Sequence, residues 1–192
     1  KGRANKMKNL NVLIVGVGGQ GTLLASRVLG KYALDEGYDV KLSEVHGMAQ
    51  RGGSVMTYVR IGEKIASPII DEGQADLILA FEKLEALRYA HYLKEGGEVL
   101  YSTQEIMPMP VVTGAAQYPQ GIEAKLHGTG VDALGLALQA GNAKAANSVM
   151  LGALCKKLGY EREKFEAALL SSIPQKTVEM NKKAFDLGYQ AV

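Results

Sequence analysis

The stretch SEVHGMAQRGGSV, residues 43–55, gathers the side chains of this chain that are best suited to chemistry. The guanidinium of Arg51 is a planar fork that can hold a carboxylate or a phosphate through two parallel hydrogen bonds. The two glycines after it let the backbone approach a ligand closely or adopt a positive φ angle. We hypothesise that this loop contacts a ligand or a partner chain. Its candidate residues are Glu44, His46, Gln50, Arg51, Gly52 and Gly53.

The segment GVGGQG, residues 16–21, fits the G-x-G-x-x-G pattern between a predicted strand and a predicted helix. Backbone amides at such a helix N-terminus favour an anion. Glu44 follows at the distance expected of an acid that binds the ribose in dinucleotide sites. Alone, the pattern indicates NAD or FAD binding. Two other interpretations stay open: binding of another anion, or glycines that only close the turn and pack the helix on the strand. The residues of this glycine loop are Gly16, Gly18, Gly19 and Gly21.

No self-contained catalytic or metal-binding set is visible in the sequence. The three histidines lie far apart and lack the spacing of metal ligands. The single cysteine, Cys155, excludes an internal disulfide. It also excludes an iron–sulfur cluster held by this chain alone, because such clusters typically need four thiolates. The apolar residues around Cys155 predict a buried thiol, and a reducing, cytoplasmic compartment fits this prediction.

Length and composition are typical of a globular protein with one domain. The formal net charge of +2 is too small to indicate a nucleic-acid partner. Apolar runs long enough to span a membrane are absent from the sequence, and so is a secretory signal. We therefore expect no nucleic acid and no membrane among its partners. Residues 1–10 are predicted to be a tail, and residues 11–192 one domain.

The spacing of apolar residues predicts alternating strands and helices. Strands are expected at residues 11–15, 38–44, 54–62, 75–81 and 97–103, with a short one at 111–114. Helices are expected at residues 21–37 and 82–93, and then through most of the chain after Asp132. The alternation within residues 54–62 predicts a half-exposed strand at a sheet edge.

These elements predict an α/β fold: a three-layer, Rossmann-like open sheet, mainly parallel, with a helical C-terminal third. The first strand–helix–strand unit implies a right-handed crossover and parallel pairing. Ligands of such sheets meet the loops beyond the carboxyl ends of the strands. We therefore expect the glycine loop and the 43–55 loop to be neighbours. Asn142 and Asn147 are expected to cap a helix start and bond across to a neighbouring loop.

Four sequence blocks, taken in order, resemble the gamma-type domain of 2-oxoacid:ferredoxin oxidoreductases. They are GVGGQGTLLASRVL, SEVHGMAQRGGSVMTYVRIG, ADLILAFEKLEALRY and GNAKAANSVMLGAL. The resemblance runs from about Asn11 to the last helices. The segment EVHGMAQRGGSV is most similar to the indolepyruvate branch of the family. The pyruvate and 2-oxoglutarate branches keep the Arg-Gly-Gly core and differ before it.

The resemblance implies a subunit that is inactive alone. Complexes of this family oxidatively decarboxylate a 2-oxoacid on thiamine diphosphate, pass electrons through [4Fe–4S] clusters to ferredoxin, and give the acyl group to coenzyme A. In the indolepyruvate branch, which acts on aryl 2-oxoacids, a large alpha subunit is implied to hold thiamine diphosphate, magnesium and the clusters. The present sequence agrees, because it has one cysteine and no Gly-Asp-Gly for a thiamine-bound magnesium. The chain alone is expected to bind no cofactor.

Within such a complex, Glu44, His46 and Gln50 are expected to orient Arg51 or contact the partner subunit. The chain would then shape the site near the substrate or coenzyme A. Several alternatives stay open. One is that the loop is only an intersubunit contact, and another is that the substrate is a different 2-oxoacid, such as pyruvate, 2-oxoglutarate or a branched-chain acid. The chain could also be a free-standing NAD-dependent oxidoreductase, or a scaffold without a role in the chemistry.

Overall fold

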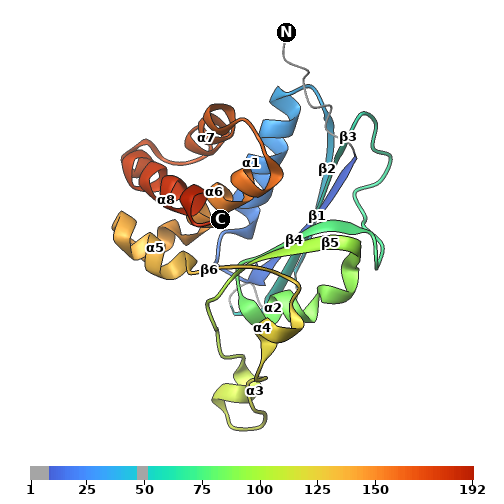
Figure 1. The fold of residues 1–192 in the computed structure, drawn as a ribbon, viewed down its shortest axis with the longest axis vertical. Helices are drawn as coiled ribbons and strands as arrows, with labels where there is room; N and C mark the ends of the chain where they lie inside the picture. The colour runs from blue at the N-terminus through green and yellow to red at the C-terminus, as the bar shows by residue number, and fades with distance from the viewer. Residues whose placement is uncertain (1–8, 47–51) are drawn as a thin grey trace.

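The computed structural model describes residues 9–46 and 52–192, which form a six-stranded open sheet (Figure 1). The strand order is β2-β3-β1-β4-β5-β6. All of these strands except β3 run in one direction, so the sheet is mainly parallel as predicted. The strands are β1 Leu10–Val17, β2 Asp39–His46, β3 Ser54–Gly62, β4 Ala75–Ala80, β5 Leu93–Ser102 and β6 Gly128–Val131.

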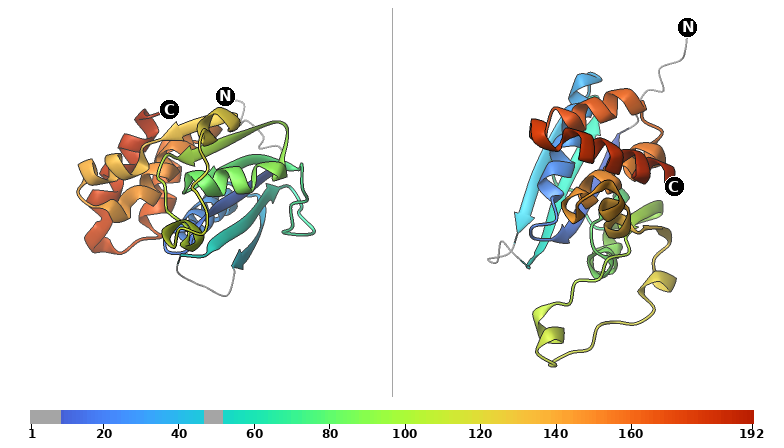
Figure 2. Two further views of the ribbon diagram at one scale, coloured as in Figure 1. Left: turned by 90° about the horizontal axis from the view of Figure 1, so that it is seen from below. Right: turned by 90° about the vertical axis from the view of Figure 1, so that its left-hand side faces the viewer.

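Helices cover both faces of the sheet and give the three layers that the sequence predicts (Figure 2). Helix α1 and the C-terminal helices α5 to α8 lie on one face, and α2 with α4 lies on the other. The α-helices are α1 Thr22–Asp35, α2 Lys83–Arg88, α3 Met109–Val112, α4 Ile122–Lys125, α5 Ala133–Ala140, α6 Ala146–Leu158, α7 Arg162–Leu170 and α8 Val178–Gln190. Short 3-10 helices are η1 Ala90–Tyr92, η2 Ala143–Ala145 and η3 Gln175–Thr177.

The position of β3 corrects two expectations from the sequence. It is not an edge strand, because it lies between β2 and β1 and pairs antiparallel with both. Nor is it half-exposed, because nearly all of its residues are buried. The connection from β2 to β3 is too short for a crossover helix, so β3 returns as a hairpin strand. The predicted pairing of β1 with β2 is therefore wrong, although the two strands run in the same direction.

Three boundaries also differ from the predictions. The helix expected at 82–93 ends at Arg88, and β5 begins already at Leu93. The sequence also predicts that Gly96 and Gly97 end this helix, and this is wrong because both lie within β5. Gly96 adopts a φ angle of 73° inside β5, where the register with β4 shifts. Residues 111–114 are not a strand, because the chain forms the single helical turn α3, with a proline near its start where the fixed φ of proline suits a helix.

The helices α6 and α8 approach each other unusually closely. A Cβ at Gly188 would lie 1.9 Å from the Val149 carbonyl oxygen, and one at Gly152 would lie 2.0 Å from the Phe185 carbonyl oxygen. Only glycine permits this contact between backbones. The hydroxyl of Ser148 also bonds across to Asn181 Oδ1 at 2.6 Å. This helical layer and the sheet share one large apolar cluster.

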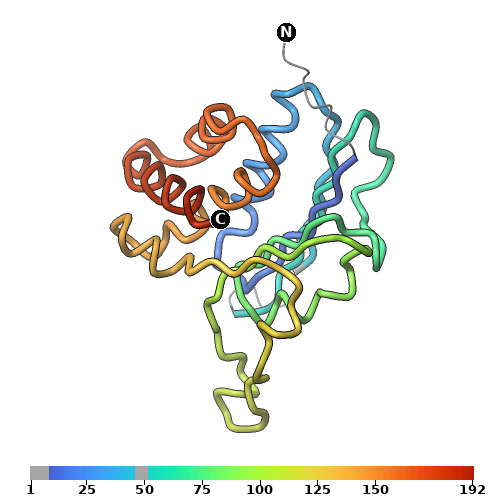
Figure 3. Tube along the Cα trace, viewed as in Figure 1, coloured from blue at the N-terminus to red at the C-terminus, as the bar shows by residue number. Residues whose placement is uncertain are grey.

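No helix within the described ranges has the length and apolar character needed to cross a bilayer. The carboxyl ends of β1, β4 and β5 lie at one edge of the sheet, where the chain also leaves the body in a long excursion around α3 (Figure 3). The loops that follow these strands therefore meet at this edge.

Candidate functional site

The glycine loop joins β1 to α1 through a backbone that glycine adopts most readily. Gly19 and Gly21 have φ angles of 102° and 88°, in the region that other residues disfavour. Gly21 is the N-cap of α1, and no side chain caps this helix. Ala25 N donates a hydrogen bond to Gly21 O, whereas the amides before Ala25 have no partner within the helix. This end of α1 is therefore suited to an anion.

The side chain of Gln20 fastens the glycine loop to the ends of two other strands. Its Oε1 accepts a hydrogen bond from Val17 N at 2.8 Å. Its Nε2 donates to Phe81 O at 2.9 Å and to Gln104 Oε1 at 3.4 Å. A Cβ at Gly16 would lie 3.0 Å from Gln20 Oε1. The first glycine of the motif thus makes room for an amide that links the carboxyl ends of β1, β4 and β5.

The two loops singled out in the sequence are neighbours, as expected. Gly18 N donates to Gly53 O at 2.8 Å, and Gly52 N donates to Gly18 O at 3.4 Å. These bonds continue the antiparallel ladder between β1 and β3 beyond the ends of both strands. Gly52 has a φ angle of 75°, which is the positive value that its residue type allows. The glycine loop therefore holds the Gly52–Gly53 end of the second loop.

Ser54 anchors the same loop to the α2 face of the sheet. Its hydroxyl donates to the Glu85 carboxylate and lies 2.9 Å from Tyr89 Oη. Arg88 Nε donates to the other oxygen of Glu85 at 3.1 Å. No partner for Ser54 was visible in the sequence. The structure brings it a carboxylate that is also paired with a cation, which makes this contact an anchor for the loop.

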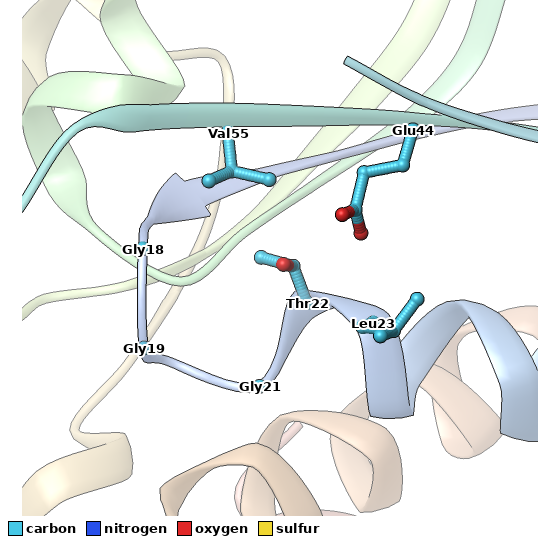
Figure 4. Close-up of a pocket in the computed structure, with 7 residues that line it drawn as sticks. All are labelled: Gly18, Gly19, Gly21, Thr22, Leu23, Glu44 and Val55. Atoms are coloured by element: carbon cyan, nitrogen blue, oxygen red, sulfur yellow. The ribbon is translucent and has the colours of Figure 1, made fainter. Parts of the chain in front are cut away.

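A hollow of about 390 Å³ opens between the glycine loop and strands β2 and β3 (Figure 4). The Glu44 carboxylate points across it toward the start of α1. In a dinucleotide site, this acid would stand on the strand beside β1. Here β3 lies between, so Glu44 stands two strand spacings, roughly 9–10 Å, from β1. The geometry disfavours the NAD site that the glycine pattern alone indicates. The residues around the hollow are Gly18, Gly19, Gly21, Thr22, Leu23, Glu44 and Val55.

A second hollow, of about 430 Å³, lies on the other side of the glycine loop. It stands where the chain order of the sheet reverses, because β1 leads to a helix on one face and β4 to a helix on the other. Ligands of open α/β sheets bind at such a point. Its polar side chains are Gln20, Ser102, Gln104, Lys144 and Asn147. Only Asn147 was singled out in the sequence, although Gln20, Ser102 and Gln104 lie at or just beyond strand ends, which is a usable signal.

The two asparagines have different structural roles. Asn142 Oδ1 accepts from Lys144 N at 2.9 Å and caps η2, which is the capping role expected of it. Asn147 does not cap α6, whose N-cap is Ala145. Its side chain packs against the glycine loop, because a Cβ at Gly21 would lie 2.5 Å from Asn147 Nδ2. The third glycine of the motif therefore lets α6 approach the start of α1.

The remaining candidates of the 43–55 loop are only partly described. His46 is the last residue of β2, and its backbone pairs with that of Val55. Gln50 and Arg51 lie outside the described residues. Within the described ranges, no group of three or more His, Cys, Asp or Glu side chains is placed to hold a metal ion.

The observed fold and the two loops that meet at its edge agree with the family that the sequence blocks resemble. Comparison with known proteins gives the same result. The chain belongs to the pyruvate ferredoxin/flavodoxin oxidoreductase family, whose model matches residues 11–191. This confirms the resemblance to the gamma-type subunit of 2-oxoacid:ferredoxin oxidoreductases. The chain is thus a subunit of an oxidoreductase complex.

Individual relatives differ in how similar they are to this chain. Indolepyruvate oxidoreductase subunit IorB from Pyrococcus horikoshii is 45% identical, over 96% of each chain. Ketoisovalerate oxidoreductase subunit VorA from Methanothermobacter marburgensis is 30% identical over 95% of this chain, which spans only 36% of VorA. Among solved structures, the gamma subunit of a keto/oxoacid ferredoxin oxidoreductase from Geobacter sulfurreducens is 30% identical. Its TM-score is 0.72, over 95% of this chain and 97% of that one.

Proposed function

We propose that the chain is the small subunit of an indolepyruvate:ferredoxin oxidoreductase. The complex would oxidatively decarboxylate aryl 2-oxoacids, form the acyl-CoA and pass the electrons to ferredoxin. The observation that supports this most strongly is the 45% identity to IorB along nearly the whole of both chains. Relatives named for other substrates, such as VorA, are less similar.

The cofactors of the reaction belong, in this proposal, to the large alpha subunit: thiamine diphosphate, magnesium and [4Fe–4S] clusters. The chain contains one cysteine, which is too few for a cluster of its own. Cys155 is fully buried, and burial raises the pKa of its thiol to about 12. A protonated, enclosed thiol is a poor metal ligand. A single free cysteine also fits a protein of the reducing cytoplasm, and we propose that the complex is located there.

The contribution of this chain would be the edge of the sheet where its two loops meet. Gly53 is held by Gly18, and Ser54 is held by Glu85. Arg51 lies shortly before these two residues in the sequence. A guanidinium suits the carboxylate of a 2-oxoacid or a phosphate of coenzyme A. We therefore propose that Arg51 contacts one of these anions, with Glu44, His46 and Gln50 beside it.

The direct test is Arg51→Ala in the complex with the large subunit. We expect the KM for the 2-oxoacid or for coenzyme A to rise about 10- to 100-fold, since a hydrogen bond to a charged group contributes about 1.5–3 kcal/mol. Arg51→Lys should recover part of this loss, because lysine keeps the charge and loses the fork. Arg27→Ala, an exposed arginine on α1, is the matched control.

Two outcomes would contradict the ligand contact. Unchanged kcat and KM values in Arg51→Ala would show that Arg51 takes no part in ligand binding or in the chemistry, and that the loop is only structural. Loss of assembly with unchanged kinetics in the residual complex would make it an intersubunit contact. Comparing indolepyruvate with pyruvate, 2-oxoglutarate and branched-chain acids tests the substrate separately. Tight NADH binding by the lone chain would support a free-standing oxidoreductase against the whole proposal.

A further inference from the structure

A projecting arm, residues 106–121, connects β5 to the helix before β6 and extends away from the body of the molecule (Figures 1 and 2). Its sequence is IMPMPVVTGAAQYPQG, which contains no charged side chain. With 22% charged residues in the whole chain, a stretch of this length would on average contain three or four. An exposed segment without charge is unusual, because charged residues favour the surface.

The root of the arm is fastened by α2 and its N-cap. The carboxylate of Glu82, which is 1% exposed, accepts hydrogen bonds from Ile106 N and Tyr118 Oη, each at 3.0 Å. Lys83 pairs with Glu105 before the arm and lies 3.2 Å from Glu123 after it. Both ends of the arm are therefore held to the start of α2 by two consecutive residues.

The tip of the arm is ordered by its own hydrogen bonds. Pro108 O accepts from Val111 N at 2.9 Å, and Met109 O accepts from Thr113 N at 2.9 Å. Ala116 N donates back to Pro110 O at 2.9 Å, which closes the tip. Prolines within the arm also lower the number of conformations available to it. A tip organised in this way loses little conformational entropy when it binds.

Large apolar side chains of this tip face solvent. Met109 is 70% exposed, Val112 is 64% exposed and Met107 is 45% exposed. Met109 and Val112 are three residues apart in a helical turn, so they share one side of it. Methionine is enriched and charged residues are depleted at the centres of protein interfaces. The arm has both properties in an ordered, projecting form.

We propose that the arm docks this chain on the large subunit of its complex, with Met107, Met109 and Val112 seated in an apolar socket of that subunit. This inference rests on the proposed function. The arm leaves the carboxyl end of β5, at the same edge as the glycine loop and Gly52–Gly53. In VorA the matching unit is 36% of one longer chain, so a large remaining portion is joined to it directly. The IorB relative is matched over 96% of its own length, so there the unit is a chain by itself and needs a non-covalent attachment in place of that covalent link.

The test is co-expression of this chain with a tagged large subunit, followed by anaerobic affinity purification and measurement of the dissociation constant. We expect the double variant Met109→Glu/Val112→Glu to bind at least about 30-fold more weakly than the wild type, because charges would enter an apolar socket. The conservative variant Met109→Leu should bind within about 3-fold of it. The matched control is Leu138→Glu on α5, whose side chain is 59% exposed. It should leave binding unchanged.

The outcomes separate the inference from the proposed function. If the wild type and the double variant both bind the large subunit equally well, the arm is not the docking element, and the proposed function is unaffected. Wild-type chain that does not assemble with the large subunit overturns both. Thermal unfolding of each lone variant must match the wild type, since the substituted side chains are exposed. A lone wild-type dimer that the double variant makes monomeric would assign the arm to self-association, against the proposal.

Discussion

The two faces of the sheet are covered in different ways. The face of α1 and α5 to α8 is packed by a large apolar cluster that includes Phe165 and Phe185. The face of α2 and α4 has a smaller cluster, with the tyrosines Tyr58, Tyr101 and Tyr118 among its members. The buried carboxylates of the described residues, Glu82 and Glu85, both come from α2 or its N-cap.

These carboxylates are used to hold loops. Glu85 binds Ser54 at the end of the 43–55 loop, and Glu82 binds both ends of the arm. A buried charge is costly unless it is hydrogen-bonded, so each carboxylate strongly favours the arrangement that satisfies it. The difference between the faces teaches a division of roles. The helical face contains the larger apolar cluster, and the α2 face holds the two segments that we propose to meet other molecules.

The largest effect should come from the helical face. Phe185 is fully buried and packs against Phe165 and Tyr189. Phe185→Ala would leave a cavity there and should lower the free energy of unfolding by about 3–5 kcal/mol. Chemical denaturation of the lone chain measures this loss. Leu138→Ala, at an exposed position, should change stability by less than about 0.5 kcal/mol. Equal effects of the two variants would show that the buried layer of the helical face does not determine the stability of the chain.

A smaller and more local effect is expected for Glu82→Gln. The amide would place an N–H group among three donors, Glu85 N, Ile106 N and Tyr118 Oη. Leaving buried donors without acceptors costs about 1–3 kcal/mol. Hydrogen exchange should speed up mainly in the arm. Glu123→Gln, at the exposed side of the ion pair with Lys83, serves as the control, with a loss of about 0.5 kcal/mol or less. Uniformly faster exchange across the whole chain would contradict a local role.

The smallest effect is a pH dependence on the α2 face. Burial raises the pKa of Tyr58 to about 12, above its ordinary value of 10. Stability from this group is therefore complete below pH 10 and is lost as the pH rises toward 12, since only the unfolded chain ionises in that range. Between pH 9 and pH 11, the wild type should lose about 1 kcal/mol more than Tyr58→Phe. Parallel losses in both proteins would show that Tyr58 does not titrate differently on unfolding.

Much of the fold is readable from local patterns. The residues of β1 and β4 are short apolar runs, and the run of β1 ends at glycines. Helix α1 buries Ala25, Val28, Leu29 and Tyr32 at helical spacing. The glycine loop and its position before a helix follow from three glycines and their neighbours. Four ordered sequence blocks were sufficient to identify the family. All of these are properties of consecutive residues.

The remaining features depend on residues that are distant in the chain. A strand such as β3, with apolar residues on both faces, fits the interior of a sheet, yet its alternation looks like that of an edge strand. The role of Gln20 became visible only when Phe81 and Gln104 were brought beside it.

The sequence alone thus establishes most of the element types, the anion-suited glycine turn and the family, because these follow from local backbone preferences and from short sequence motifs. Other features come only from the assembled fold. These are the position of β3 in the sheet, the separation of Glu44 from β1, and the anchoring of the 43–55 loop and the arm to α2. The physical reason is that buried hydrogen bonds and strand pairs form between segments that are distant in the chain. Local propensity does not determine which of these segments come into contact.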